Sequence, residues 1–319
     1  MNLVVATVYN NPAMGLGAKV VAKDRSSGTS SEPREPLNRG SFTFISWDCK
    51  WLLESSMHGL KGWGMRIGAQ AFPRGPPAIE MLSRAHSQGF QALEVVLEEP
   101  NAPKSLRVEE RIELRDRAER LGVALLVHAP FSHIDPAGLS NKLRTAALGE
   151  LKSALQLSSD ICASLLTLHA PDSKRLTSRV LSSYVSTFAS LYSLGRDLGV
   201  RLAIENTYQS LEEFLKLLSR IPEEGRFVTF DCGHANIYSN PLAFLEGLSK
   251  EIVVNVHIHD NNGSKDEHLV LGKGNIRFEE VLRSLSYRGY KGSLILEHIR
   301  VADFASSRKA LLGIMNRIS

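Results

Sequence analysis

The chain has 319 residues, of which 43% are hydrophobic and 23% charged, so it can bury a large core and is neither disordered nor fibrous in bulk. Its 38 basic and 34 acidic side chains give a net charge of +4 without long basic runs, so charge alone argues neither for nor against nucleic-acid binding. Three scattered cysteines, no apolar run of about 18 residues and no basic leader at the start predict a cytoplasmic protein that does not enter a membrane.

The first 64 residues differ from the rest of the chain. The run from Lys23 to Pro36 is polar, rich in Ser and Pro, and follows neither the helical nor the strand period. The flanking pieces contain apolar residues but no pattern long enough to stand alone. We expect residues 1–64 to be a poorly ordered or non-conserved extension, with a lid or a homo-oligomerisation arm as the functional alternative. Residues 65–319 are then a single domain.

From Met65 onward, short β-prone runs alternate with amphipathic helical stretches. The candidate strands are 65–70, 92–97, 123–128, 165–169, 201–205, 227–231, 253–259 and 293–297. Helices such as 109–121 and 177–198 lie between them, and Gly199 ends the second. Eight such repeats over about 255 residues predict an α/β fold, the closed (β/α)8 TIM barrel, which usually takes about 250. A doubly wound open sheet would need a G-x-G-x-x-G turn after an early strand, and none follows the first two.

Most candidate strands from the third onward end in a residue that can bind a metal ion. These residues are His128, His169, Glu205, Asp231, His257 and Glu297. Because the carboxyl ends of barrel strands converge on one mouth, side chains far apart in sequence meet there. The pattern therefore predicts a divalent-metal site of carboxylate oxygens and imidazole nitrogens.

Two short clusters extend this set. His234 follows Asp231 by three residues across a turn that Gly233 permits. His257 and His259 share one side of a strand, and Asp266 and His268 follow after a turn. We expect His259 to hydrogen-bond a ligand carboxylate rather than to bind metal. Mixed carboxylates and imidazoles suit zinc, manganese, cobalt or magnesium.

Five motifs in order resemble the xylose isomerase-like barrel superfamily. They are Ile204-Glu205-Asn206-Thr207, Asp231-x-x-His234, His257-x-His259-Asp260, Asp266-x-His268 and Leu296-Glu297. The superfamily includes sugar phosphate isomerases and epimerases and the endonuclease IV type of abasic-site nuclease. The resemblance covers residues 65–319 and implies a core metal site on Glu205, Asp231, His257 and Glu297. In the isomerase branch it implies that Glu205 and Glu297 transfer protons on a sugar or sugar phosphate through a metal-stabilised enediolate, while His234 orients a substrate hydroxyl.

The nuclease branch is the alternative. There the resemblance implies up to three zinc ions, with His128, His169, His234, Asp266 and His268 as additional candidate ligands, Glu205 bridging, and DNA as the partner. Two observations favour the isomerase branch. The loop 97–101 carries Glu98 and Glu99, which would repel a phosphate backbone, and Glu94 and the run 260–263 look more like that branch.

Ketose epimerases tend to carry an arginine just after the ligand on the seventh strand. This sequence departs from that pattern, because residues 261–265 include no arginine. A metal-binding barrel that serves only as a scaffold is a third possibility. The Gly272-Lys273-Gly274 run lacks the spacing of a phosphate-binding loop, so it predicts a tight turn.

Overall fold

The computed structural model describes residues 4–11, 15–22, 43–46, 64–172 and 176–318. The chain separates into two compact units, Met1–Lys50 and Trp51–Ser319. In the first unit, β1 (Val4–Asn11) pairs antiparallel with both β2 (Gly15–Ala22) and β3 (Thr43–Ser46). The sequence pattern indicates no element there, and the Ser- and Pro-rich run Lys23–Pro36 lies outside the described residues.

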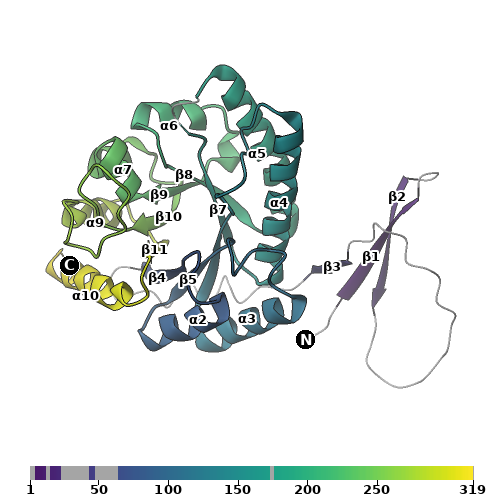
Figure 1. The fold of residues 1–319 in the computed structure, drawn as a ribbon, viewed down its shortest axis with the longest axis horizontal. Coiled ribbons are helices and arrows are strands. Elements are labelled where there is room, and N and C mark those ends of the chain that lie inside the picture. Colours follow the sequence, from purple (N-terminus) through teal and green to yellow (C-terminus); the bar gives the residue numbers. More distant parts are fainter. Residues whose placement is uncertain (1–3, 12–14, 23–42, 47–63, 173–175, 319) are drawn as a thin grey trace. The chain divides into compact units, whose positions relative to one another are not determined.

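The second unit contains a closed barrel of eight parallel strands, which confirms the predicted fold (Figure 1). Neighbouring strands follow chain order, and the last strand pairs with the first to close the ring. The strands are β4 (Arg66–Ala71), β5 (Ala92–Val96), β6 (Ala124–His128), β7 (Leu165–His169), β8 (Arg201–Glu205), β9 (Val228–Asp231), β10 (Val253–Ile258) and β11 (Ser293–Leu296).

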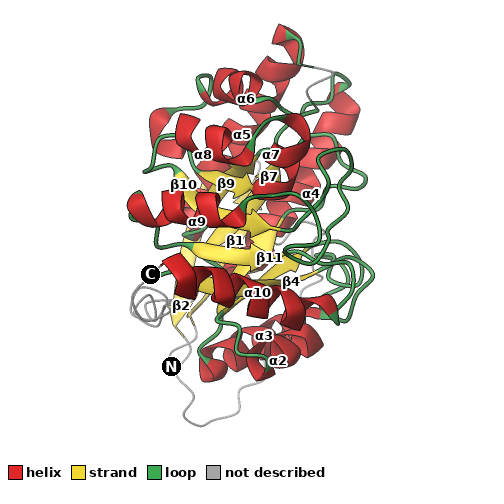
Figure 2. Cartoon of the chain, turned by 90° about the vertical axis from the view of Figure 1, so that its left-hand side faces the viewer, coloured by secondary structure: helices red, strands yellow, loops and turns green. Residues whose placement is uncertain are grey.

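Helices surround the strands and bury the outer face of the barrel (Figure 2). They are α2 (Ala78–Ser87), α3 (Val108–Leu121), α4 (Asn141–Asp160), α5 (Ser178–Leu198), α6 (Leu211–Leu218), α7 (Cys232–Tyr238), α8 (Pro241–Gly247), α9 (Phe278–Tyr287) and α10 (Asp303–Ile318). Helix α5 begins where Thr177 Oγ1 accepts a hydrogen bond from the Val180 N–H, and it ends at Gly199 with a φ of 70°. Within the described part of the chain, no helix is both long and apolar enough to cross a bilayer.

The barrel interior is layered, because alternate residues of each strand point inward. The lowest layer is apolar and comprises Ala92, Leu126, Leu165, Ala203 and Ile295. The next inward positions are polar and comprise Glu94, Thr167, Thr229 and Asn255, all buried and joined by hydrogen bonds across the barrel. The layer above them is the mouth, where the predicted ligands lie. Strand period and barrel closure therefore position the site.

A substitution at Gly68 tests how tightly the apolar layer is packed. It pairs with Ile295 on one side and with Ala92 on the other, and an added Cβ would collide with both side chains. We expect Gly68→Ala to lower the free energy of unfolding by about 1–3 kcal/mol through overpacking. Gly149→Ala is the matched control, because Gly149 is an exposed position of α4 where an added Cβ would contact nothing. This substitution should raise the free energy of unfolding by about 0.5–1 kcal/mol. Urea denaturation measures both, and a stabilised Gly68→Ala would contradict the packing.

Candidate metal centre

Four side chains from neighbouring strands meet around one atom, the Nδ1 of His257. Glu297 Oε1 lies 3.0 Å from it, Glu205 Oε1 3.2 Å and Asp231 Oδ2 3.8 Å. All four side chains are buried. The strand-end pattern thus identified residues that the fold does bring together.

The donor set around His257 fits a divalent cation. Three carboxylates converge in a buried space, where uncompensated negative charge is strongly unfavourable. Asp231 Oδ2 is buried and has no hydrogen-bond partner among the described residues, although such atoms are nearly always paired. Ligand atoms of Glu205, Asp231 and His257 lie within 4.8 Å of one another, as do those of Glu94, His257 and Glu297. A hard cation would satisfy the oxygens of Glu205, Asp231 and Glu297.

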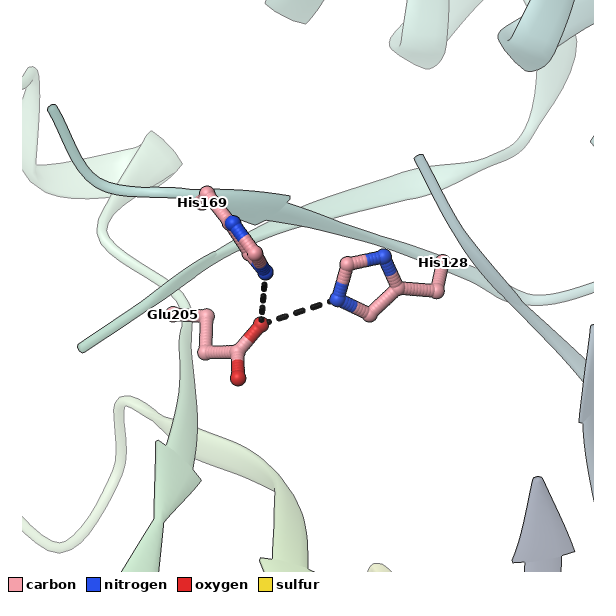
Figure 3. A group of neighbouring side chains, drawn as sticks. All are labelled: His128, His169 and Glu205. Atoms are coloured by element: carbon pink, nitrogen blue, oxygen red, sulfur yellow. Dashed lines mark hydrogen bonds and ion pairs between the residues drawn. The ribbon is translucent and has the colours of Figure 1, made fainter. Parts of the chain in front are cut away.

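A second group of ligand atoms shares Glu205 with the first. Its Oε2 lies 3.0 Å from His128 Nε2 and 3.3 Å from His169 Nε2 (Figure 3). The other ring nitrogen of His128 contacts the carbonyl oxygen of Ala129 at 2.8 Å, and Phe131 stacks on the His169 ring. Because Oε1 faces His257 while Oε2 faces the two histidines, Glu205 can bridge two sites.

A third group lies on the other side of Asp231. Asp266 Oδ2 lies 3.2 Å from His268 Nε2 and 3.4 Å from His234 Nε2. His259 stacks on His268, and its Nε2 lies 3.3 Å from Asp231 Oδ1. This approach is the carboxylate contact predicted for His259, although among the described residues neither ring nitrogen meets the geometry of a hydrogen bond. His259 also takes part in two of the groups of candidate ligand atoms.

Gly233 makes room for this third group. An added Cβ at this position would overlap the His259 ring. The carboxylate of Asp231 accepts a hydrogen bond from the His234 N–H at 2.6 Å and so begins α7 immediately after the strand. In the Asp-x-x-His motif, Asp231 is thus the N-cap of α7, and this turn directs both side chains toward the mouth.

The loop carrying Asp266 and His268 is organised by the buried carboxylate of Asp260. Its Oδ2 accepts hydrogen bonds from the N–H groups of Gly272 at 2.8 Å and Gly274 at 2.9 Å. These groups are therefore not available to a phosphate, as expected for a tight turn. The Leu271 N–H donates to Ser307 Oγ of α10 at 3.1 Å, and His268 has a positive φ of 47°, a strained value for a residue with a side chain.

Electrostatics in the centre couple carboxylates to imidazoles. Burial alone would raise the pKa of Glu205, but His257 and His169 outweigh it and hold that pKa well below its ordinary value. Burial would lower the pKa of His257, but Glu297 and Glu94 raise it well above its ordinary value. Burial does prevail at His169, where it lowers the pKa to about 3. Without a cation, charged imidazoles compensate the buried carboxylates.

A cavity of about 650 Å³ lies between the loops that follow β4, β5 and β6. Arg74, Leu97, Pro130 and Asp135 are among its lining residues, whereas the candidate ligands of the described chain are not. The cavity is therefore distinct from the metal centre.

Two residues of the centre are not among the six residues that the strand-end pattern singled out. Glu94 lies one inward position below the end of its strand, where a search of strand ends does not reach. His259 follows the end of β10, and only the period of two that it shares with His257 indicates that it faces the same side.

Comparisons with known proteins agree with the barrel fold. The family model described as xylose isomerase-like TIM barrel matches residues 82–313. Uncharacterized protein MJ1311 of Methanocaldococcus jannaschii is 29% identical over 276 residues, which cover 82% of this chain and 90% of that protein. Fructoselysine 3-epimerase of Escherichia coli O157:H7 is 21% identical over 165 residues, 49% of this chain and 60% of that protein. The crystal structure of a D-tagatose 3-epimerase-like protein is 28% identical with a TM-score of 0.71, covering 80% of this chain and 98% of that one. The chain belongs to the xylose isomerase-like TIM barrel family.

Proposed function

We propose that this protein is a divalent-metal-dependent isomerase or epimerase of a sugar or sugar phosphate. One observation carries the proposal: Glu205 and Glu297 bring carboxylate oxygens to within 3.2 Å and 3.0 Å of the same His257 nitrogen. Their strands β8 and β11 are separated in the barrel by β9 and β10. The two carboxylates therefore approach one point from different directions, as proton transfer on opposite faces of a carbon requires.

Glu205, Asp231, His257 and Glu297 would hold the cation, with zinc, manganese, cobalt or magnesium all compatible with the donors. A cation held by these residues would supply polarisation of a substrate carbonyl and its adjacent hydroxyl, which would favour loss of a proton from the neighbouring carbon. One glutamate removes that proton and the other returns one. The similarity to a D-tagatose 3-epimerase-like protein and to a fructoselysine 3-epimerase supports a small sugar derivative as the substrate.

His234 would orient a substrate hydroxyl. Its backbone is fixed by Asp231, and its Nδ1 contacts the carbonyl oxygen of Asn206 at 3.0 Å. Its Nε2 points toward Asp266, and 12% of its side chain remains exposed at the mouth. The ring is thus held in place and open to a ligand.

The first test replaces Glu297 by Gln, which keeps the side-chain volume but cannot accept a proton. With a ketose that wild-type protein converts, chosen from D-tagatose and other ketohexoses and their phosphates, we expect turnover to fall by about 10²–10⁴-fold. Deuterium incorporation into product in D₂O should fall equally. Glu267→Gln on the neighbouring loop is the matched control, and circular dichroism checks the fold. Unchanged deuterium incorporation in Glu297→Gln would refute this role.

The second test concerns pH and metal affinity. Burial would lower the pKa values of His234 and His257, but Asp231 and Glu297, respectively, are the leading groups that raise them well above their ordinary value. Near neutral pH both rings are protonated in the metal-free protein, and a cation held by His257 must displace a proton from that ring. Affinity should therefore increase with pH, by about tenfold per unit for each displaced proton. Calorimetry between about pH 6 and pH 8 measures it, and a flat profile contradicts the assignment.

A zinc-dependent endonuclease acting at abasic sites is the second candidate. The observation that favours it is the pair of further ligand groups on either side of the tetrad, with Glu205 shared between two groups. The carboxylates after β5 still oppose DNA, because they keep their charge although they accept hydrogen bonds within the protein. Glu98 Oε1 accepts hydrogen bonds from the N–H groups of Phe131 and Ser132, and Glu99 accepts one from Ser105.

Metal stoichiometry separates the two candidates. Elemental analysis of zinc-saturated protein should find about one tightly held ion for the isomerase, and about three for the nuclease, in which clustered cations activate a water. A nuclease should also nick duplex DNA that contains an abasic site, at a rate that falls steeply with salt. Three ions together with nicking would replace the isomerase proposal, whereas one ion without nicking would dispose of the nuclease.

A further inference from the structure

Glu94 is a buried carboxylate to which the proposed reaction gives no role. It lies on β5 in the polar layer directly beneath the mouth, and none of its surface is exposed. A carboxylate so placed is strongly destabilising unless hydrogen bonds satisfy its oxygens. Its contacts must therefore explain its position.

Both oxygens of Glu94 are engaged by residues of other strands. Oε1 accepts hydrogen bonds from Asn255 Nδ2 at 3.1 Å and from Thr167 Oγ1 at 3.3 Å. Oε2 accepts one from Gln70 Nε2 at 3.1 Å and lies 2.9 Å from His257 Nε2. Donors from β4, β7 and β10 thus hold the carboxylate in one orientation, with one oxygen directed at His257.

This contact determines how His257 can act. Nε2 faces Glu94, while Nδ1 faces the carboxylates of the centre. A proton on Nε2 that bonds Glu94 leaves a lone pair on Nδ1, so the contact selects both the tautomer and the direction of the ring. Asn255 Nδ2 also lies 3.2 Å from Nε2, but the carboxylate is nearer and, being charged, is the stronger partner.

Gln70 extends the arrangement to a second candidate ligand. Its Nε2 donates to Glu94 and also to Glu297 Oε1 in a close contact. Glu94 thereby fixes the Gln70 amide, and the amide in turn restrains Glu297. A single carboxylate below the mouth is connected to candidate ligands on β10 and just after β11.

We propose that Glu94 is a positioning residue, which directs His257 Nδ1 and, through Gln70, the Glu297 carboxylate toward a divalent cation. The inference rests on the proposed metal dependence and assigns a role to a residue outside the core tetrad. It predicts an effect on metal affinity itself, before any substrate is bound.

The test measures Co²⁺ affinity of metal-stripped protein by competition with a chromophoric chelator, and the visible spectrum of the bound ion. Glu94→Gln retains the side-chain volume but has only one acceptor oxygen. When that oxygen accepts a hydrogen bond from Asn255, the amide nitrogen faces His257 Nε2 and cannot accept its proton. We expect affinity to fall by about 10–100-fold and the Co²⁺ absorption bands to shift. Thr229→Val is the matched control, because Thr229 bonds Thr167 at 2.9 Å in the same layer. It should leave both readouts unchanged.

Glu94→Asp keeps the proposal falsifiable if Glu94→Gln fails to fold. It keeps a carboxylate in the layer but withdraws it from His257 by one methylene, so affinity should fall by less than in Glu94→Gln. Folded variants that bind Co²⁺ as tightly as wild type, with the same spectrum, would overturn the role of Glu94 and leave the proposed function intact. Wild-type protein that binds no cation would overturn the proposed function and this inference together.

Discussion

Four carboxylates are buried in the upper interior of the barrel, and the arrangement of the residues around them depends on how their charge is compensated. Glu94, Glu205, Asp231 and Glu297 are all nearly inaccessible to solvent, and each lies close to an imidazole. Like charges in a low-dielectric interior repel strongly, so such a cluster persists only with protonated histidines or bound cations between its members. The same feature that would destabilise an ordinary core defines the mouth of this one.

The barrel accommodates these charges by placing different kinds of side chain at different depths. Apolar side chains fill the lowest layer, neutral hydrogen-bonding groups surround Glu94 in the middle, and the carboxylates and histidines lie at the top. Because every strand contributes at intervals of two residues, each layer is assembled from side chains far apart in sequence. The apolar cluster thus lies deeper in the barrel, and the candidate ligands lie at the mouth.

Much of this arrangement could be predicted from the sequence. Alternation along each strand shows which residues point inward, and closure of the barrel brings the strand ends together. The bounds of β7 and β8 agree with the predicted runs, and the residues at the ends of β6 to β11 meet as expected. The position of Glu94 relative to His257 could not be predicted, because it depends on how strands on opposite sides of the barrel face one another. The orientation of the His259 ring likewise depends on how it stacks on His268, which lies in a loop whose path follows from Asp260. The pairing of β1, β2 and β3 carries no repeated pattern in the sequence that would reveal it.

The hydrogen bond from Leu271 to Ser307 has a consequence for how the mouth is completed. Ser307 lies on the last helix, and the segment that supplies Asp266 and His268 is bound both to that helix and to Asp260. The loop that carries the third group is therefore held in part by its contact with α10. Loss of this contact would loosen the candidate ligands Asp266 and His268, although the described part of the helix supplies no candidate ligand itself.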